Sequence, residues 1–148
     1  MSLEDQLLYL LAKRGYTNVH QAPRIRLLAK FVEKNYQVPN RLLQIRSDYA
    51  SRVQAVDREI NAERAPLSDK LQKERGDEWD SRRLDGGLYV LQTVDVILAW
   101  LVAEDEGAKI KIQSLLEDQG DGLRGVKATL QGEVVPPIFE VHSWLTCP

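Results

Sequence analysis

The sequence has few of the residues from which catalytic and metal sites are built. Its 148 residues include one cysteine, Cys147, and two histidines, His20 and His142. A single cysteine allows neither an internal disulfide nor a cysteine-based metal site, and it fits a reducing, intracellular compartment. His142 and Cys147 together offer only two ligands, and His20 has no carboxylate or thiol at ligand spacing. We therefore expect no metal and no cofactor.

The usual signals of nucleophiles and phosphate-binding loops are also missing. Ser81, Ser114 and Ser143 lack the glycine-flanked strand-to-helix turn that exposes a catalytic serine. Gly86 and Gly87 belong to neither a GxxxxGK nor a GxGxxG motif, and they fall inside a helical pattern. The sequence therefore predicts no catalytic residue and favours a protein that is not an enzyme.

An excess of charge of one sign is absent as well. The chain has 20 Lys and Arg against 22 Asp and Glu, for a formal net charge of −2. This balance gives no electrostatic reason to expect binding to nucleic acid or to an anionic membrane surface. The opening residues MSLEDQ do not form a basic region followed by an apolar one, so we expect no secretory signal and a soluble protein.

The most apolar stretch, Ser81–Val102, predicts a buried central helix over about 80–103. It is apolar almost all round, which a helix shows when other elements cover it on several sides. A membrane span is not expected, because Asp95 lies in its middle and its first half is charged. We expect the Asp95 carboxylate to reach a helix N-terminus, the turn at Thr93 or a basic side chain such as Lys109. The alternative role for Asp95 is contact with a partner.

Apolar residues at helical spacing continue through most of the chain. A stripe of six such residues predicts one long helix over about 40–64. The length of this helix makes a coiled coil the alternative, but the sequence has too few heptads for one. The charged stretch 65–80 predicts an exposed, mobile connector anchored by Trp79, in which Ser68 and the residues after it could form a short helix. With the central helix, the pattern gives about six to seven helices, and the remaining ones are expected at 2–15, 23–35, 108–118 and 123–131.

Two features of these helices lead to further expectations. Two glycines inside a helix cost about 1 kcal/mol each relative to alanine, so we expect Gly87 to lie at a close crossing with another helix. The opening helix contains more leucine than one packed side can hide. We therefore expect self-association through the N-terminal helix, with Leu7 and Leu11 on its outer side.

Three segments, taken in order, resemble the C-terminal region of the beta-catenin-like protein 1 family. They are RLLAKF (Arg26–Phe31), VDREINAER (Val56–Arg64) and SRRLDGGLYVLQ (Ser81–Gln92). The resemblance implies an all-α fold, the end of an armadillo-like α-solenoid, in which 1–131 form a helical domain of a longer solenoid. Residues 132–148 match nothing in the family pattern and are expected to form an irregular tail.

The resemblance also implies a function. Members of this family are nuclear, spliceosome-associated scaffolds that bind a Myb-type splicing factor and, in animals, an antibody-diversifying deaminase. The chain would then be a non-enzymatic scaffold in pre-mRNA splicing, located in the nucleus, although it shows no localisation signal of its own. The alternative is an independent helical adaptor without a splicing role. The polar residues that match the family, Arg82, Arg83 and Asp85, are candidate partner contacts, and both arginines are expected to be exposed.

Overall fold

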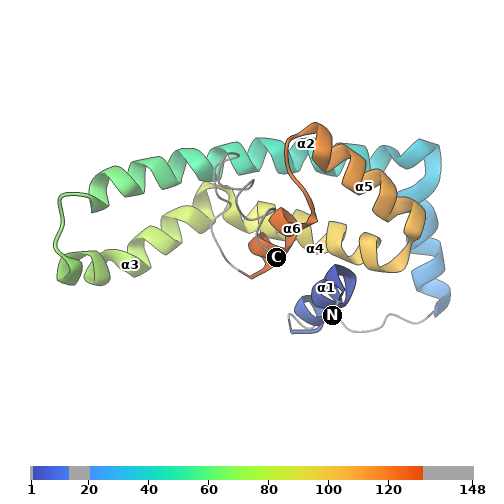
Figure 1. Ribbon diagram of the computed structural model, residues 1–148, viewed down its shortest axis with the longest axis horizontal. Coiled ribbons are helices and arrows are strands. Elements are labelled where there is room, and N and C mark those ends of the chain that lie inside the picture. Colours follow the sequence, from blue (N-terminus) through green and yellow to red (C-terminus); the bar gives the residue numbers. More distant parts are fainter. Residues whose placement is uncertain (1, 14–20, 132–148) are drawn as a thin grey trace.

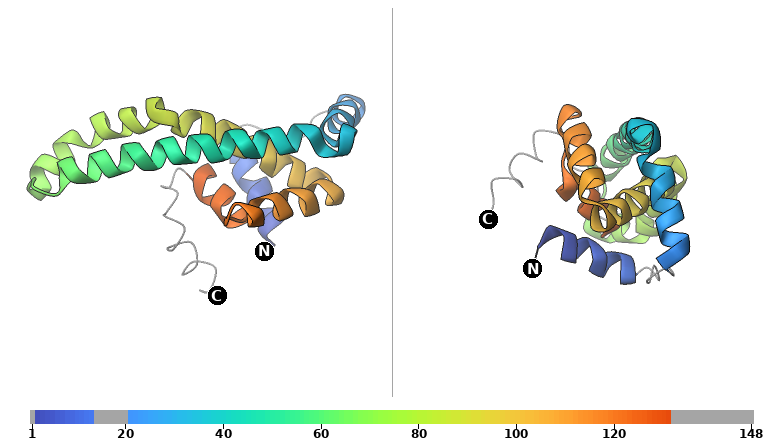
Figure 2. Two further views of the ribbon diagram at one scale, coloured as in Figure 1. Left: turned by 90° about the horizontal axis from the view of Figure 1, so that it is seen from above. Right: turned by 90° about the vertical axis from the view of Figure 1, so that its right-hand side faces the viewer.

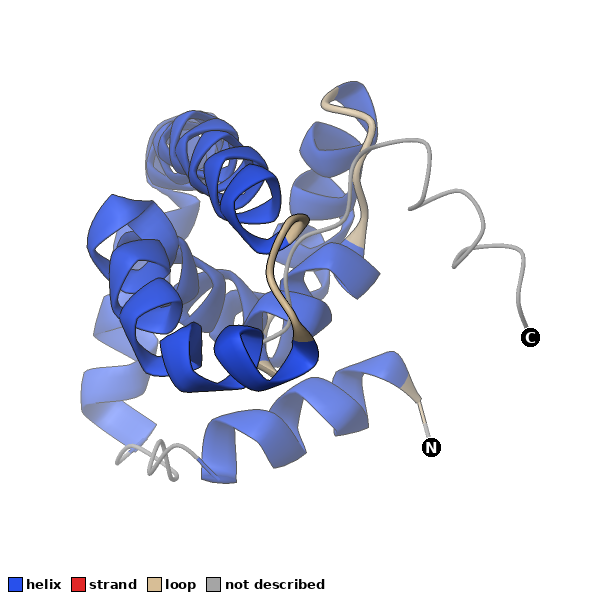
Figure 3. Ribbon diagram, turned by 90° about the vertical axis from the view of Figure 1, so that its left-hand side faces the viewer, coloured by secondary structure: helices blue, strands red, loops and turns tan. Residues whose placement is uncertain are grey.

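The computed structural model describes residues 2–13 and 21–131, and these residues are almost entirely helical (Figure 3). They contain no strand, which confirms the all-α prediction. The predicted tail 132–148 lies outside the described residues. In chain order the elements are α1 (Leu3–Lys13), α2 (Gln21–Arg64), α3 (Asp69–Arg83), the single π-helical turn η1 (Leu84–Leu88), α4 (Tyr89–Glu104), α5 (Glu106–Asp118) and α6 (Leu123–Leu130).

Helix α2 consists of two helices that meet at a sharp break. Lys34, Asn35 and Tyr36 have φ values of 51°, 54° and 61°, in the left-handed region that L-residues seldom adopt. The break falls at the predicted boundary between two helices. Pro39 lies in the first turn after it, where the missing proline N–H leaves no helical hydrogen bond unmade. The side-chain amide of Asn40 donates from Nδ2 to the backbone carbonyl of Tyr36 at 2.9 Å and closes the turn.

The second part of α2 forms a long antiparallel hairpin with α3, η1 and α4, which follow one another directly and are kinked at Gly87. The tip of this hairpin extends beyond the other helices (Figures 1 and 2). At the opposite end α1, α5 and α6 pack around α4, which also contacts α2. Because four helices cover it, α4 buries apolar side chains on several sides, and this confirms the predicted central helix. Its buried residues are Leu91, Val94, Asp95, Val96, Leu98, Ala99, Leu101 and Val102.

By length and composition, the helical run Asp69–Glu104 could cross a membrane. Within the structure, however, 56% of its most apolar window is buried against the rest of the molecule. A core helix meets the same criteria of length and apolar content. We therefore attribute its apolar character to packing against the surrounding helices.

Helix α3 occupies most of the stretch predicted as an exposed connector, and its residues are mostly exposed but form a regular helix. Ser68 caps its N-terminus, since the side-chain oxygen accepts from the backbone N–H of Leu71 at 3.4 Å. Trp79 is almost completely buried and holds the helix against α2, which confirms its predicted role as anchor. The stretch has few apolar residues, yet one buried indole supplies much of the apolar area that a short helix needs.

Helix α1 corrects the expected outer side of the opening helix. Leu7 and Leu11 are buried in the main core, and α1 contacts α4 and α6 through this side. Tyr9, in contrast, is exposed. The two leucines are therefore part of the interior, and they do not form the outward surface on which the predicted self-association depended.

Candidate protein-interaction surface

Ion pairs join the two halves of the hairpin near its tip. The Arg82 guanidinium donates to both carboxylate oxygens of Glu63, at 2.7 and 2.8 Å, and lies 3.6 Å from Glu59. Hydrogen bonds from Arg82 and Trp79 lower the pKa of Glu63, and the bond to Glu63 raises the pKa of Arg82. Solvent reaches this ion pair and screens it, so the pair contributes little to the free energy of folding. Its main effect is to orient the Arg82 side chain toward α2. Arg82 is thus already occupied within the chain.

Arg83 makes the same kind of contact closer to the core. Its Nε donates to Asp57 at 2.8 Å, and the two side chains are only 13% and 15% exposed. Arg83 Nη2 and Asp57 Oδ2 have no hydrogen-bond partner, so the contact is a single bond and not a two-bond fork. The expectation that both family-matching arginines are exposed is therefore wrong for Arg83. Whether either arginine contacts a partner stays a prediction.

Trp79 contacts charged residues of both α2 and α3 near the tip of the hairpin. Its indole Nε1 donates to Glu63 at 3.1 Å, while the guanidinium groups of Arg64 and Arg75 lie 5.0 and 5.2 Å from the ring centroid. Cation–π contacts of this kind contribute about 0.5–1 kcal/mol each at partly exposed sites. Together these contacts fix the face that α3 presents to α2.

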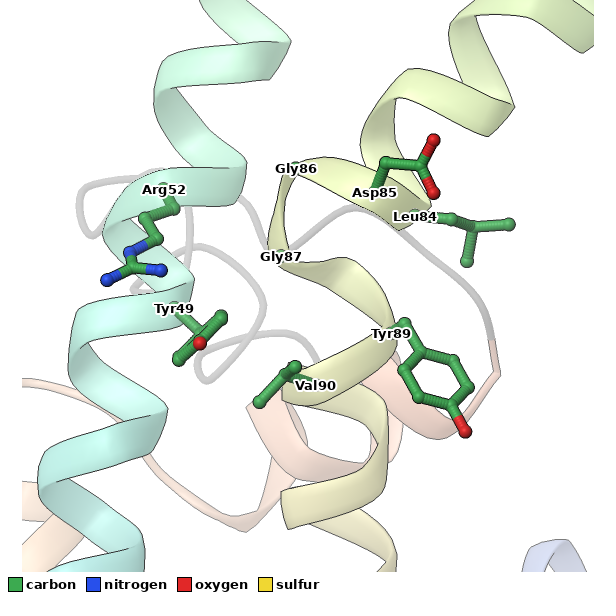
Figure 4. A pocket seen from close by; sticks show the side chains of 8 residues that line it. All are labelled: Tyr49, Arg52, Leu84, Asp85, Gly86, Gly87, Tyr89 and Val90. Carbon is green, nitrogen blue, oxygen red and sulfur yellow. The ribbon is translucent and has the colours of Figure 1, made fainter.

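Between the middle of α2 and the π-helical turn there is an open pocket of about 570 Å³, which we call the α2–η1 groove (Figure 4). Residues of α2 form one wall, and residues of η1 and the start of α4 form the other. Figure 4 shows the Gly86–Gly87 turn lying between these walls. The groove is lined by Tyr49, Arg52, Leu84, Asp85, Gly86, Gly87, Tyr89 and Val90.

The two glycines bring η1 against α2, which confirms the predicted close crossing at Gly87. A Cβ atom on Gly87 would lie 3.2 Å from the Tyr49 ring and 3.4 Å from its carbonyl oxygen. A Cβ on Gly86 would lie 2.6 Å from Val56 Cγ2, so an alanine there requires the valine to move. Gly87 also has φ 132°, which only glycine adopts readily.

The groove carries two charged side chains, Arg52 and Asp85, and an exposed aromatic ring, Tyr89. The Arg52 guanidinium lies 4.4 Å from the centroid of the Tyr49 ring, a cation–π contact that orients it without neutralising it. Asp85 is exposed, and neither residue forms an ion pair with any other described residue. Tyr89 is 70% exposed at the mouth. Aromatic and arginine side chains in this arrangement are typical of protein interfaces.

A second polar cluster lies inside the core at the opposite end of the hairpin. Arg46, on α2, donates from Nε to Asp95 at 2.7 Å and from Nη1 to Asp121 at 2.6 Å. The side chains of Arg46 and Asp95 are 2% and 0% exposed. The predicted basic partner of Asp95 is therefore found, but it is Arg46 and not Lys109. These bonds join α2, α4 and the connection between α5 and α6.

Burial dominates the electrostatics of this cluster. It raises the pKa of Asp95 to about 6, although Arg46 and the nearby Thr129 hydroxyl act in the opposite direction. Burial alone would lower the pKa of Arg46, but the two carboxylates together raise it above its ordinary value. Arg46 Nη2 and Asp95 Oδ2 have no partner, so the pair is joined by one bond. The cluster holds three parts of the fold together, and its central residues Arg46 and Asp95 are too deeply buried to contact a substrate.

The described part of the chain offers no constellation for metal chemistry. Within residues 2–13 and 21–131, no group of three or more His, Cys, Asp or Glu side chains could hold a metal ion. His20, His142 and Cys147 lie outside the described residues. The groove, with its mixed apolar and charged walls, is a feature of this region that could receive another molecule.

These features define an all-α interaction module in which a helical hairpin presents a mixed groove. The chain belongs to the catenin-beta-like family, described as Arm-motif containing and nuclear, whose model matches residues 3–131. This match confirms the resemblance seen in the sequence and the armadillo-like character of the fold.

Curated relatives agree with the family match. The chain is 28% identical to Beta-catenin-like protein 1 of Mus musculus over 114 residues, which cover 74% of this chain and 20% of the mouse protein. It is 27% identical to the Beta-catenin-like protein 1 homolog of Schizosaccharomyces pombe over 95 residues, or 64% of this chain and 16% of that protein. The chain thus spans about a fifth of the length of these relatives. No solved structure matches it.

Sequence reasoning missed both Arg52 and Arg46. Arg52 sits among many charged residues on α2, and only the fold places it beside the glycine turn. Arg46 had a usable signal, because a carboxylate inside an apolar helix needs a cationic partner. Arg46 directly follows Ile45, which belongs to the apolar stripe predicted for this helix. A slightly wider buried face would have included Arg46.

Proposed function

We propose that the chain is part of a non-enzymatic protein-interaction scaffold of the armadillo type, associated with the spliceosome and pre-mRNA splicing. The observation that carries the proposal is the family match over residues 3–131, because the family is described as Arm-motif containing and nuclear. Similarity to beta-catenin-like proteins of mammals and fission yeast supports it. In this proposal the chain acts in the nucleus as the C-terminal capping part of a longer solenoid.

The structure supports binding of proteins more than any chemistry. Armadillo-type proteins bind partners on extended surfaces made by stacked helices. Here the long hairpin offers such a surface, and Asp85 is the candidate contact that is exposed and forms no ion pair with another described residue. Arg82 and Arg83 would contact a partner only through the parts of their side chains left free by Glu63 and Asp57.

The proposal can be tested by tagging the protein at its own locus, so that its native length is kept, and purifying it from nuclear extract. Mass spectrometry should show enrichment of splicing-complex proteins over a tag-only control, and microscopy should place the protein in the nucleus. A variant Asp85→Lys tests the candidate contact. Asp77→Lys is its matched control, because Asp77 is also exposed but lies on α3 away from the groove.

Each outcome bears on a different part of the proposal. Enrichment that Asp85→Lys abolishes and Asp77→Lys preserves would support Asp85 as the contact. Enrichment that survives both variants would keep the splicing role and remove Asp85 from it. If the tagged protein instead enriches a defined set of proteins without splicing components, the splicing role is wrong and the alternative, an independent helical adaptor, is favoured.

A further inference from the structure

The two walls of the α2–η1 groove carry opposite charges that form no ion pair with any described residue. Arg52 stands on the α2 wall and Asp85 on the η1 wall. Nearby on the same hairpin Arg75, Arg82 and Arg83 all form ion pairs within the chain. Arg52 and Asp85 line one pocket and yet form none with any described residue. Arg52 and Asp85 are thus opposite charges on the two sides of one groove, and a docking partner that carries both charge signs would pair with them.

The placement of these charges suits one partner in particular. Figure 4 shows Arg52 and Asp85 at about the same level, on either side of the Gly86–Gly87 turn, with their side chains pointing away from each other. A two-fold axis that runs along the groove exchanges its left and right walls. It therefore brings the Arg52 wall of one molecule over the Asp85 wall of another, and makes the contact twice.

We propose that a second copy of this chain docks on the α2–η1 groove, with Arg52 of each copy paired with Asp85 of the other. Charge alone would give modest affinity, because exposed pairs contribute little. The η1 wall adds apolar area, since Leu84 and Tyr89 are both exposed beside Asp85. In the two-fold arrangement this area covers the Tyr49 wall of the second copy, and the exposed Tyr89 ring becomes buried.

This docking surface differs from the one that the sequence suggested. Leu7 and Leu11 are interior, so α1 does not offer the leucine surface expected of it. The groove lies on the hairpin, at residues that the ion pairs and the glycine turn hold in place. The inference goes beyond the proposed function, because association between copies requires no splicing partner.

Sedimentation of the purified 148-residue chain, from micromolar to millimolar concentration, should show a monomer–dimer equilibrium. Arg52→Glu and Asp85→Lys should each raise the dimer dissociation constant about tenfold or more, because each places like charges at both symmetry-related contacts. Arg58→Glu and Asp77→Lys, at exposed positions outside the groove, are matched controls and should leave it within about twofold. Circular dichroism should show the same helicity and thermal midpoint in all variants.

Mixing the two groove variants provides the sharpest test. A pair made of one Arg52→Glu chain and one Asp85→Lys chain has opposite charges at both contacts, whereas each variant alone has like charges at both. The mixture should therefore regain the association of the parent. A parent that stays monomeric at the highest concentration overturns the proposal. So does a mixture no stronger than its components, or a loss that the control variants share, whatever the splicing experiment shows.

Discussion

Replacing Arg46 with methionine is expected to be among the most damaging single changes in the core. The methionine keeps much of the volume and the apolar stem but removes the guanidinium that binds Asp95 and Asp121. Asp95 is completely buried and has no other cation beside it in the described structure. The substitution therefore isolates the effect of an uncompensated buried carboxylate.

The size of the effect follows from what the carboxylates lose. Removing one partner of a buried ion pair costs about 3–5 kcal/mol, because the remaining charge stays desolvated. Asp121 is 16% exposed, so water can replace its bond to Arg46, and we assign most of the loss to Asp95. The total stability of a domain this size is about 5–15 kcal/mol. Arg46→Met should therefore lower the free energy of unfolding by about a fifth of that total or more.

The pH dependence supplies a sign that packing loss would not show. Burial raises the pKa of Asp95 to about 6 from its ordinary 3.8, so the folded chain holds this proton more tightly than the unfolded chain does. The contribution of Asp95 to stability is thus complete below its ordinary pKa and is lost as pH rises through the folded value. Without Arg46 the carboxylate is still harder to ionise. The cost of Arg46→Met should therefore be large at pH 8 and smaller at pH 5.

Urea denaturation of both chains at the two pH values measures the effect. The double variant Arg46→Met/Asp95→Leu is the control, since replacing a buried pair by apolar groups is often neutral. It should recover most of the lost stability. A cost below about 1 kcal/mol, equal at both pH values, would show that Asp95 is not a desolvated charge and would refute the reasoning.

Three further outcomes are expected from thermal or urea unfolding. Gly87→Ala should cost about 1–3 kcal/mol, because φ 132° is strained for any side chain and Tyr49 is close, whereas Gly76→Ala, in open space on α3, should stabilise by about 0.5–1 kcal/mol; equal effects would remove the assigned strain. Trp79→Ala should cost about 3–5 kcal/mol, and a value under 1 would show that α3 does not depend on its anchor. Leu7→Glu should unfold or strongly destabilise the chain, since it buries an unpaired charge; a stable variant would contradict the interior position of Leu7.

The sequence predicts elements well where apolar spacing or proline defines them. The boundary before Pro39 follows from the missing N–H, and the structure breaks α2 just before it. The central helix can be predicted because apolar residues surround it, whereas a surface helix is apolar on one side only. Close approach at Gly87 follows from the cost of glycine within a helix, although the π-helical turn itself leaves no mark in the sequence.

The remaining features depend on contacts between residues far apart in the chain. Helix α3 looks like a connector because its stability comes from Trp79 and from Glu63, which lies on another helix. Arg83 looks exposed because its partner, Asp57, is 26 residues away. Only Arg46 could have been anticipated, from the need of Asp95 for a cation. Local patterns contain no information on which opposite charges the hairpin brings together.

The π-helical turn has a geometric consequence for the hairpin as a whole. Each residue of an α-helix advances about 100° around its axis, so one extra residue in a turn changes the phase of all that precedes it. Both Trp79 in α3 and Leu91 in α4 are buried in the hairpin. Because Gly87 leaves the helical conformation with φ 132°, an uninterrupted α-helix through the same sequence would turn one of them away from the interior of the hairpin. The backbone at Gly86 and Gly87 thus determines which side of α3 faces α2, and therefore which of its residues are buried.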